Sequence, residues 1–383
     1  MGGRDEARRA VLEALGARGE IPTELLAYNS PGCQPGSVPP GNLPMADEPH
    51  VEAWRAYARE ASDVGVFAAL QHRLVQLRFP VENGISQSPA YRAATRRGEM
   101  EVAPAQGLVL AHPEGLTLTI HPTLAGHVPV LCVAERRDFE LLVCALTSRN
   151  EPEAVPAAMG ACIVSGLNNW DRVAAYRSRW AAGHADAADE DAWAEEFRRL
   201  IPQKDLYQDR LILLSSGPYS AVPASQVGLD EGEWLRRSIV LRREHECAHY
   251  FTRRALGFMR NNVFDELLAD FAGLVGAFGR YEPQLALLFL GLERHPVYRP
   301  GGRLESYVGA PPLSDEAQVV LREMTVRAAH SLGQVAGSRG SGNLVDLLPV
   351  LATLTLEELA SPSSIEQAIA QGAPRSTRGM TPR

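Results

Sequence analysis

The stretch LRREHECAHYFTRRALG, residues 241–257, contains two histidines four positions apart and a glutamate directly after the first. In a helix, residues four apart lie on one face, with about 5 to 6 Å between their Cβ atoms. The imidazoles of His245 and His249 can therefore bind one metal ion. Glu246 is rotated by about 100° from His245. This places its carboxylate beside such an ion, where a base for a metal-bound water is needed.

Local signals around this stretch predict a helix of about 26 residues. Asp230 followed by Glu233 matches a capping box, in which the first side chain accepts a hydrogen bond from the third helical residue and the glutamate reaches back. Arg253 and Arg254 complement the negative end of the helix, and Gly257 suits the left-handed conformation that follows a helix. The two histidines fall on the apolar stripe of this helix and so face inward.

A second helix is predicted in VFDELLADFAGLVGAFG, residues 263–279, with Asn262 as its cap. The short connection favours antiparallel packing, and the small residues on one stripe allow a close approach between the two helices. Glu266 can then complete a three-ligand site, and Asp270, one turn further on, can orient a ligand imidazole. The alternative is a solvated helix with chance histidines at its apolar edge. The agreement of the caps, the histidine pair and the downstream carboxylates favours a metal site.

Residues 230–280 resemble the gluzincin zinc metallopeptidases, the thermolysin-like group, with HECAH as the HExxH motif and ELLAD as ExxxD. The resemblance implies a zincin-like α+β fold and a hydrolytic Zn²⁺ site. It implies His245, His249 and Glu266 as zinc ligands, Glu246 as the general base and Asp270 as the partner of a ligand histidine.

The chain departs from the thermolysin-like pattern at two points. Asp265 stands where thermolysin-like enzymes have Asn, and the spacing from His249 to Glu266 is shorter than in thermolysin. The extended metzincin motif does not fit, because it requires Gly at Thr252 and His at Ala255. The gluzincin group therefore remains the better match.

An oxyanion that forms at a metal usually has a second stabilising group from another segment. The candidates are Tyr219, Arg299, Arg303, Tyr307 and His330, together with Tyr298 and His295. Each of these alone is more often an ordinary surface residue. Tyr219 follows a predicted strand, residues 209–216, and zincin sheets by analogy place an edge strand before the active helix, where it pairs with an extended substrate.

The composition argues against several classes of partner. The net charge is −8 and the arginines are spread along the chain, which is not typical of a nucleic-acid-binding protein. The five cysteines include no CxxC pair, which favours reduced thiols in a cytoplasm. No run approaches the roughly 18 apolar residues of a membrane span, and no apolar signal region begins the sequence. We expect a cytoplasmic protein without nucleic-acid or membrane partners, and the sequence leaves its oligomeric state open.

Hydrophobic periodicity predicts a predominantly helical α+β chain with a small mixed sheet. Helices are expected over residues 5–17 and 51–77, short strands and then a helix between 107 and 147, and a strand over 209–216. The predicted parts are an N-terminal helix with a flexible arm (1–50), an N-terminal α/β part (51–204), a zincin core with both motif helices (205–280) and a C-terminal helical part (281–383).

Three functional hypotheses follow from the sequence. The first is an intracellular metallopeptidase that cleaves an amide bond with zinc-activated water. The second is a zinc enzyme that acts on a non-peptide small molecule in a biosynthetic pathway, which a deep closed pocket would favour. The third is a non-catalytic protein with a structural metal, for which a fourth protein ligand would be expected.

Overall fold

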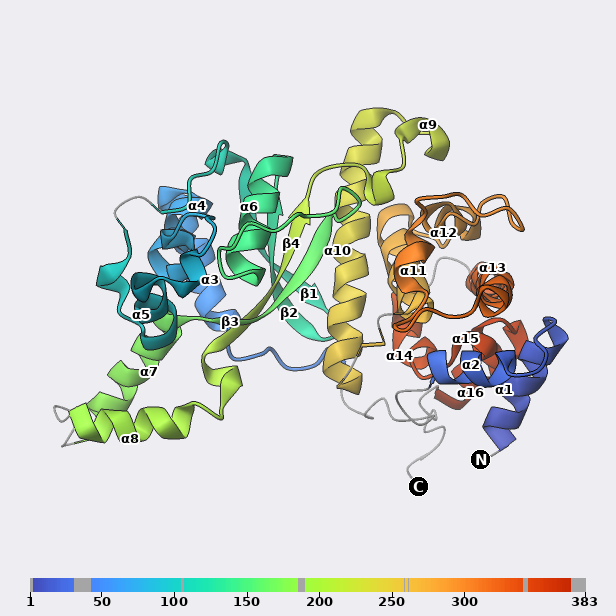
Figure 1. The fold of residues 1–383 in the computed structure, drawn as a ribbon, viewed down its shortest axis with the longest axis horizontal. Helices are drawn as coiled ribbons and strands as arrows, with labels where there is room; N and C mark the ends of the chain where they lie inside the picture. The colour runs from blue at the N-terminus through green and yellow to red at the C-terminus, as the bar shows by residue number, and fades with distance from the viewer. Residues whose placement is uncertain are drawn as a thin grey trace, which may run out of the picture. The chain divides into compact units, whose positions relative to one another are not determined.

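The computed structural model describes residues 3–30, 43–104, 107–184, 190–257, 259–260, 262–339 and 344–372. The chain forms two compact units: unit 1 combines Met1–Gly41 with Val222–Arg383, and unit 2 is Asn42–Ala221 (Figure 1). The predicted mainly helical α+β class with one small mixed sheet is confirmed for the described residues. The likeness to the zincin fold stays a prediction.

Unit 2 contains a four-stranded mixed sheet in the order β1-β2-β4-β3. β1 (Leu116–Thr123) pairs antiparallel with β2 (Gly126–Val133), and β2 pairs parallel with β4 (Gln208–Ser215). β3 (Ala161–Asn168) pairs antiparallel with β4 at the edge of the sheet. The sequence predicted β4, but the expected edge position was wrong, because β4 lies between β2 and β3. The sequence did not predict β3, because the register shift around Gly166 interrupts the alternation that identifies a strand.

One hydrophobic core in unit 2 joins the sheet to three helices. These are α3 (Val51–Val64), α4 (Val66–Arg73) and α6 (Arg136–Thr147), which contribute Trp54, Leu70 and Phe139 to the core. The helices α5 (Pro89–Arg97), α7 (Trp170–Ala182) and α8 (Glu190–Leu200) complete the unit. The prediction of one helix over 51–77 was wrong, because Gly65 adopts a φ of 89° and separates α3 from α4.

Unit 1 is built from both ends of the sequence. Its first helices are α1 (Gly3–Ala14) and α2 (Ile21–Tyr28), and its last are α15 (Leu356–Leu359) and α16 (Pro362–Gly372). The buried guanidinium of Arg8 lies 3.2 Å from the carboxylate of Glu357, and Arg4 pairs with Glu358 at 2.8 Å. These ion pairs join the N-terminal helices to the C-terminal ones.

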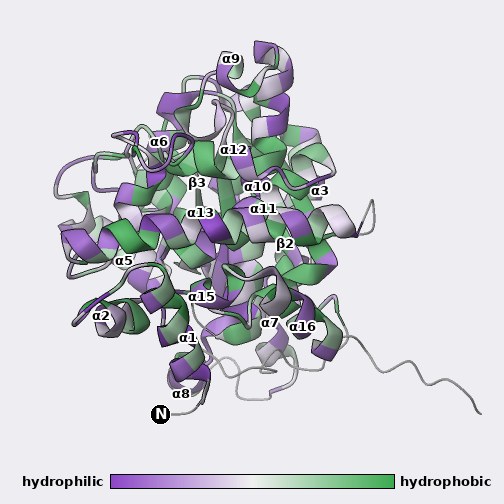
Figure 2. Ribbon diagram, turned by 90° about the vertical axis from the view of Figure 1, so that its right-hand side faces the viewer, coloured by the Kyte–Doolittle hydropathy of each residue, from purple (hydrophilic) through white to green (hydrophobic). Residues whose placement is uncertain are grey.

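The remaining helices of unit 1 surround its core. They are α9 (Ala224–Val227), α10 (Glu231–Leu256), α11 (Val263–Phe278), α12 (Pro283–Leu290), α13 (Asp315–Ser338) and α14 (Leu348–Leu351). Every residue of α11 from Val263 to Val275 is buried, so α11 is a central helix. α13 carries hydrophilic and hydrophobic residues in turn along its length (Figure 2), as expected for a helix with one buried stripe.

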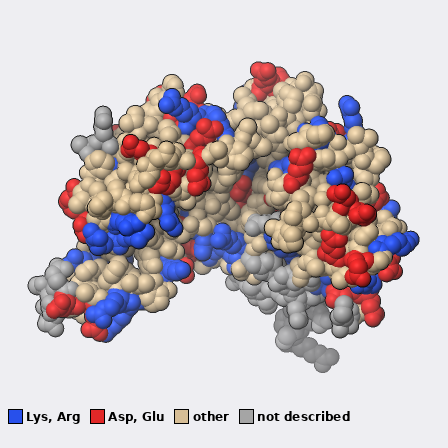
Figure 3. All heavy atoms as spheres, in the orientation of Figure 1, with Lys and Arg blue, Asp and Glu red and all other residues tan. Residues whose placement is uncertain are grey.

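The surface carries both signs of charge. On the face shown in Figure 3, acidic and basic side chains are interspersed. No helix among the described residues is long and apolar enough to cross a membrane.

Candidate metal centre

The helix that carries the two histidines begins and ends where the sequence predicts. α10 runs from Glu231 to Leu256, Asp230 accepts a hydrogen bond from the backbone N–H of Glu233 at 2.8 Å, and Gly257 has a φ of 79°. The second half of the predicted capping box was wrong. The carboxylate of Glu233 instead binds Arg236 and Arg237, because these arginines lie three and four residues further along the same helix face.

α11 packs antiparallel against α10, as predicted. The side chain of Asn262 accepts a hydrogen bond from the backbone N–H of Asp265 and so caps α11. The small residue Gly273 allows the close approach: a Cβ at this position would lie 2.8 Å from the backbone oxygen of Leu241. This packing places the first turns of α11 opposite the histidines of α10.

His245, His249 and Glu266 form a buried group that can hold a metal ion. The Nε2 atoms of the two histidines are 3.1 Å apart, and the carboxylate oxygens of Glu266 lie 3.3 Å from His249 and 3.6 Å from His245. Ligands about 2.0 to 2.1 Å from a tetrahedral zinc are separated from one another by about 3.3 to 3.4 Å. The three observed separations bracket that value.

One oxygen of Glu266 also indicates an ion. Its Oε2 is buried and accepts no hydrogen bond from any described residue. A buried carboxylate oxygen without a donor is costly unless a cation compensates it. Arg303 is an ion-pair partner of this oxygen at 3.5 Å but donates no hydrogen bond to it, so the oxygen keeps a lone pair for a metal. The donor set therefore fits a divalent metal bound by three protein ligands.

Asp270 fixes the orientation of the first histidine. The Nδ1–H of His245 donates to Asp270 at 3.0 Å, which leaves the lone pair of Nε2 directed toward His249 and Glu266. Metal-binding histidines are commonly oriented by a carboxylate in this way. The position of Asp270, one turn after Glu266, is the one that the sequence predicted for this contact.

Arg303 connects Glu266 and Asp270, two of the three carboxylates of α11. It binds Asp270, and its Nε lies 3.5 Å from Glu266 Oε2. Burial opposes the ionisation of Glu266, but Arg303 and the two histidines outweigh it, so the pKa of Glu266 lies well below its usual range. Burial also opposes protonation of His249, yet Glu266 raises the pKa of His249 to about 9. At neutral pH the metal-free site therefore holds the carboxylates ionised and a proton on His249, and a metal must displace this proton to bind.

Glu246 lies on α10 between the two histidines and is less buried than either. Its negative charge contributes to the raised pKa of His249. Asp265, the other acidic residue of the first turn of α11, accepts a hydrogen bond from the backbone N–H of Arg260 instead.

A family model describing a family of unknown function, DUF7005, matches residues 10–363. The chain belongs to DUF7005. Comparisons with curated proteins and with solved structures gave no match. The metal site of this DUF7005 chain is therefore argued from its own residues and geometry.

The structure places only some of the predicted oxyanion stabilisers of this DUF7005 chain near the metal group. Arg303 and Tyr307 lie at the two ends of the 3-10 helix η7 (Arg303–Tyr307). Burial raises the pKa of the Tyr307 hydroxyl above its usual range, and the negative charge of Glu266 raises it further.

The other candidates are engaged elsewhere or belong to unit 2. Arg299 binds Glu293 and the backbone oxygen of Leu288, and the hydroxyl of Tyr298 donates to the backbone oxygen of Gly302. His295 contacts Glu323 at 2.8 Å. His330 is exposed on α13, and Tyr219 begins a 3-10 helix of unit 2, Tyr219–Ala221. A catalytic role for any of these residues stays a prediction.

Tyr28 supports the site from the N-terminal segment, although no sequence pattern pointed to it. Its hydroxyl donates to the backbone oxygen of Tyr307 at 2.5 Å and accepts from the backbone N–H of Val263 at 3.1 Å. It therefore joins α2 to the start of α11 and to η7. No local pattern identifies such a residue, because its partners are more than 200 positions away.

Proposed function

We propose that this protein is a zinc-dependent hydrolase, and specifically a metallopeptidase, in which Glu246 acts as the general base. The observation that carries the proposal is the convergence of His245, His249 and Glu266, with Asp270 bound to the Nδ1 atom of His245. Glu246 directly follows His245 on the same helix. Two histidines and one carboxylate leave one position of a tetrahedral site open, which is typical of catalytic rather than structural zinc.

When bound there, zinc supplies a water molecule of lowered pKa and polarises the carbonyl of the substrate. Glu246 takes the proton of the attacking water and returns it to the leaving amine, since a carboxylate beside the ligands can reach both atoms. Asp270 keeps His245 in the tautomer whose Nε2 binds the metal. Tyr307 retains its hydroxyl proton at neutral pH and can donate a hydrogen bond to an oxyanion.

The first test is the metal content of the purified protein after supplementation. We expect roughly one equivalent of zinc, and the loss of this metal in Glu266→Ala. A content below about 0.2 equivalents would contradict a zinc site of this geometry.

The second test separates catalysis from metal binding. Glu246→Gln should keep the metal and lose hydrolysis of a fluorogenic peptide library by about 100-fold or more. Glu233→Gln is the matched control, because Glu233 lies on the same helix and pairs with Arg236 and Arg237. Unchanged turnover in Glu246→Gln would remove Glu246 as the base. Metal binding without peptide hydrolysis in the wild type would favour a non-peptide substrate or a structural metal.

A further inference from the structure

Unit 2 contains a cavity of about 620 Å³ that is separate from the metal group. Residues of α5, of the segment that ends α6, and of β3 line it. The lining is mainly polar and includes the hydroxyl side chains of Ser86, Thr95 and Thr147. A polar cavity of this size can enclose a small molecule with several hydrogen-bonding groups.

The cavity has positive charge that is not compensated in its walls. Arg96 and Arg149 line it and are both exposed, and no aspartate or glutamate is among the described residues that line it. Neither guanidinium forms an ion pair or hydrogen bond with another residue that the structure describes. Two unpaired guanidinium groups in one cavity favour a negatively charged ligand.

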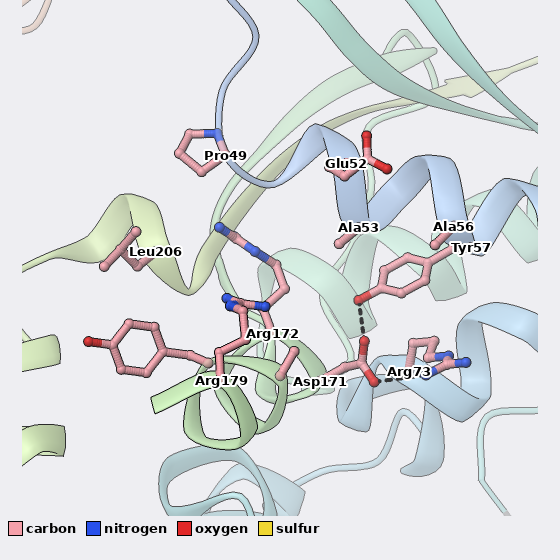
Figure 4. A pocket seen from close by; sticks show the side chains of 12 residues that line it. Pro49, Glu52, Ala53, Ala56, Tyr57, Arg73, Asp171, Arg172, Arg179 and Leu206 are labelled. Atoms are coloured by element: carbon pink, nitrogen blue, oxygen red, sulfur yellow. Dashed lines mark hydrogen bonds and ion pairs between the residues drawn. The ribbon is translucent and has the colours of Figure 1, made fainter. Parts of the chain in front are cut away.

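In a second cavity of unit 2, of about 480 Å³, carboxylates of the protein compensate the charge of two arginines (Figure 4). There Arg73 pairs with Asp171 at 3.0 Å, and the hydroxyl of Tyr57 donates to the same carboxylate. Arg172 pairs with Asp209 at 2.5 Å. These two arginines are occupied by carboxylates of the protein, and Glu52 adds negative charge to the lining, so the second cavity is a weaker candidate for an anion although Arg179 also lines it.

The backbone at Arg149 is held in an unusual conformation. Arg149 and Asn150 have φ values of 55° and 61°, in the left-handed region that residues other than glycine seldom adopt. The fully buried side chain of Asn150 donates to the backbone oxygens of Gln76 and Phe79 and accepts from the Tyr91 hydroxyl. These bonds fix the turn that presents Arg149 at the cavity, and such strain is concentrated at functional sites.

We propose that the cavity lined by α5, α6 and β3 binds a small hydroxyl-bearing anion, a phosphate ester or a carboxylate, through Arg96 and Arg149. The ends of α5 and α6 bring partial negative charge to the cavity, which weakens anion binding by a factor of about 2 to 5 per helix. Each charge-assisted hydrogen bond from an arginine strengthens it by a factor of about 10 to 100. The favourable effect of the two arginines on anion binding therefore exceeds the unfavourable effect of the two helix ends.

Isothermal titration calorimetry of the full chain at low salt tests this proposal. The probes are inorganic phosphate, glucose 6-phosphate, glucuronate and glucose. We expect glucose 6-phosphate or glucuronate to bind more tightly than inorganic phosphate, and glucose not to bind. The order of the two anions tells whether the natural ligand carries a phosphate or a carboxylate. Arg96→Ser and Arg149→Ser should each weaken the binding by about tenfold or more, and Arg149→Lys by less.

Arg179→Ser is the matched control, because Arg179 is an exposed arginine that lines the second cavity. It should leave the affinity unchanged. Loss of binding in Arg179→Ser but not in Arg149→Ser would move the anion to the second cavity and overturn the proposal. So would binding that survives both Arg96→Ser and Arg149→Ser, or no saturable binding of any anion up to about 10 mM. Glucose 6-phosphate and glucuronate that bind no more tightly than inorganic phosphate would overturn the requirement for hydroxyl groups.

Discussion

Asp270 binds His245 through one carboxylate oxygen and Arg303 through the other. Asp270→Asn removes the charge that stabilises the orientation of His245, so we expect the affinity for zinc to fall by about 10- to 100-fold. Competition with a chromophoric chelator measures this loss. Asp265→Asn is the control from the same helix, because Asp265 accepts a hydrogen bond from the backbone N–H of Arg260. An equal loss in both variants would mean that Asp270 has no special role.

Arg303 compensates two buried carboxylates in the metal-free protein. In Arg303→Gln these carboxylates lose their partner, which destabilises the metal-free form by about 3 to 5 kcal/mol. Bound zinc restores positive charge, so we expect zinc to raise the melting temperature of Arg303→Gln by more than that of the wild type. Calorimetry with and without zinc compares the two shifts, and a smaller shift in Arg303→Gln would contradict this account of Arg303.

At the scale of elements, the metal site depends on how closely α10 and α11 pack. Gly273→Ala places a methyl group against the backbone of Leu241 and should cost about 1 to 3 kcal/mol of unfolding free energy. It should also weaken zinc binding, because Glu266 and Asp270 lie on the displaced helix. Gly337→Ala, near the end of α13, meets nothing within 4 Å and should be neutral or slightly stabilising. Urea unfolding of both variants is the measurement, and equal stability of the two would contradict the close approach.

The elements that the sequence predicted well are those with local signals. Asp230, Gly257 and Asn262 mark the ends of α10 and α11, and the structure confirms all three. The histidine pair and the ExxxD motif could also be recognised from local sequence, because each lies on one helix. Periodicity alone failed at Gly65, where a positive φ interrupts a continuous apolar pattern, and at the bulge in β3.

The contacts that surround the metal group could not be predicted, because they join distant segments. Arg303 was one of several equal candidates, and only the folded chain separates it from Arg299, which binds Glu293. Tyr28 was not a candidate at all. Its role depends on the association of α2 with α11, and no local pattern encodes that association.

At the scale of the molecule, Tyr28 predicts how the stability of the chain varies with pH. Burial raises the pKa of Tyr28 to about 12, above its usual value of 10.0, so the folded protein keeps a proton that the unfolded chain loses. This contribution to stability is complete below about pH 10 and is lost as the pH rises through about 12. Tyr28→Phe lacks this contribution. The difference in the free energy of unfolding between the wild type and Tyr28→Phe should therefore shrink between about pH 9 and pH 11.5.

Urea unfolding across this range measures the difference between wild type and Tyr28→Phe. Other buried tyrosines are present in both proteins, so their titration cancels in the comparison. A difference that does not change with pH would show that the Tyr28 hydroxyl titrates alike in the folded and unfolded chains.

Unit 1 combines two segments of the sequence that lie on either side of unit 2, and this has a consequence for synthesis on the ribosome. Unit 2 is one continuous stretch, Asn42–Ala221, and its sheet can form as soon as that stretch has emerged. Arg4 and Arg8 are translated before unit 2, yet their partners Glu357 and Glu358 come more than 340 residues later. The helices α1 and α15 can therefore meet only after all of unit 2 has been translated, so unit 1, with the candidate metal group, is able to fold later than unit 2.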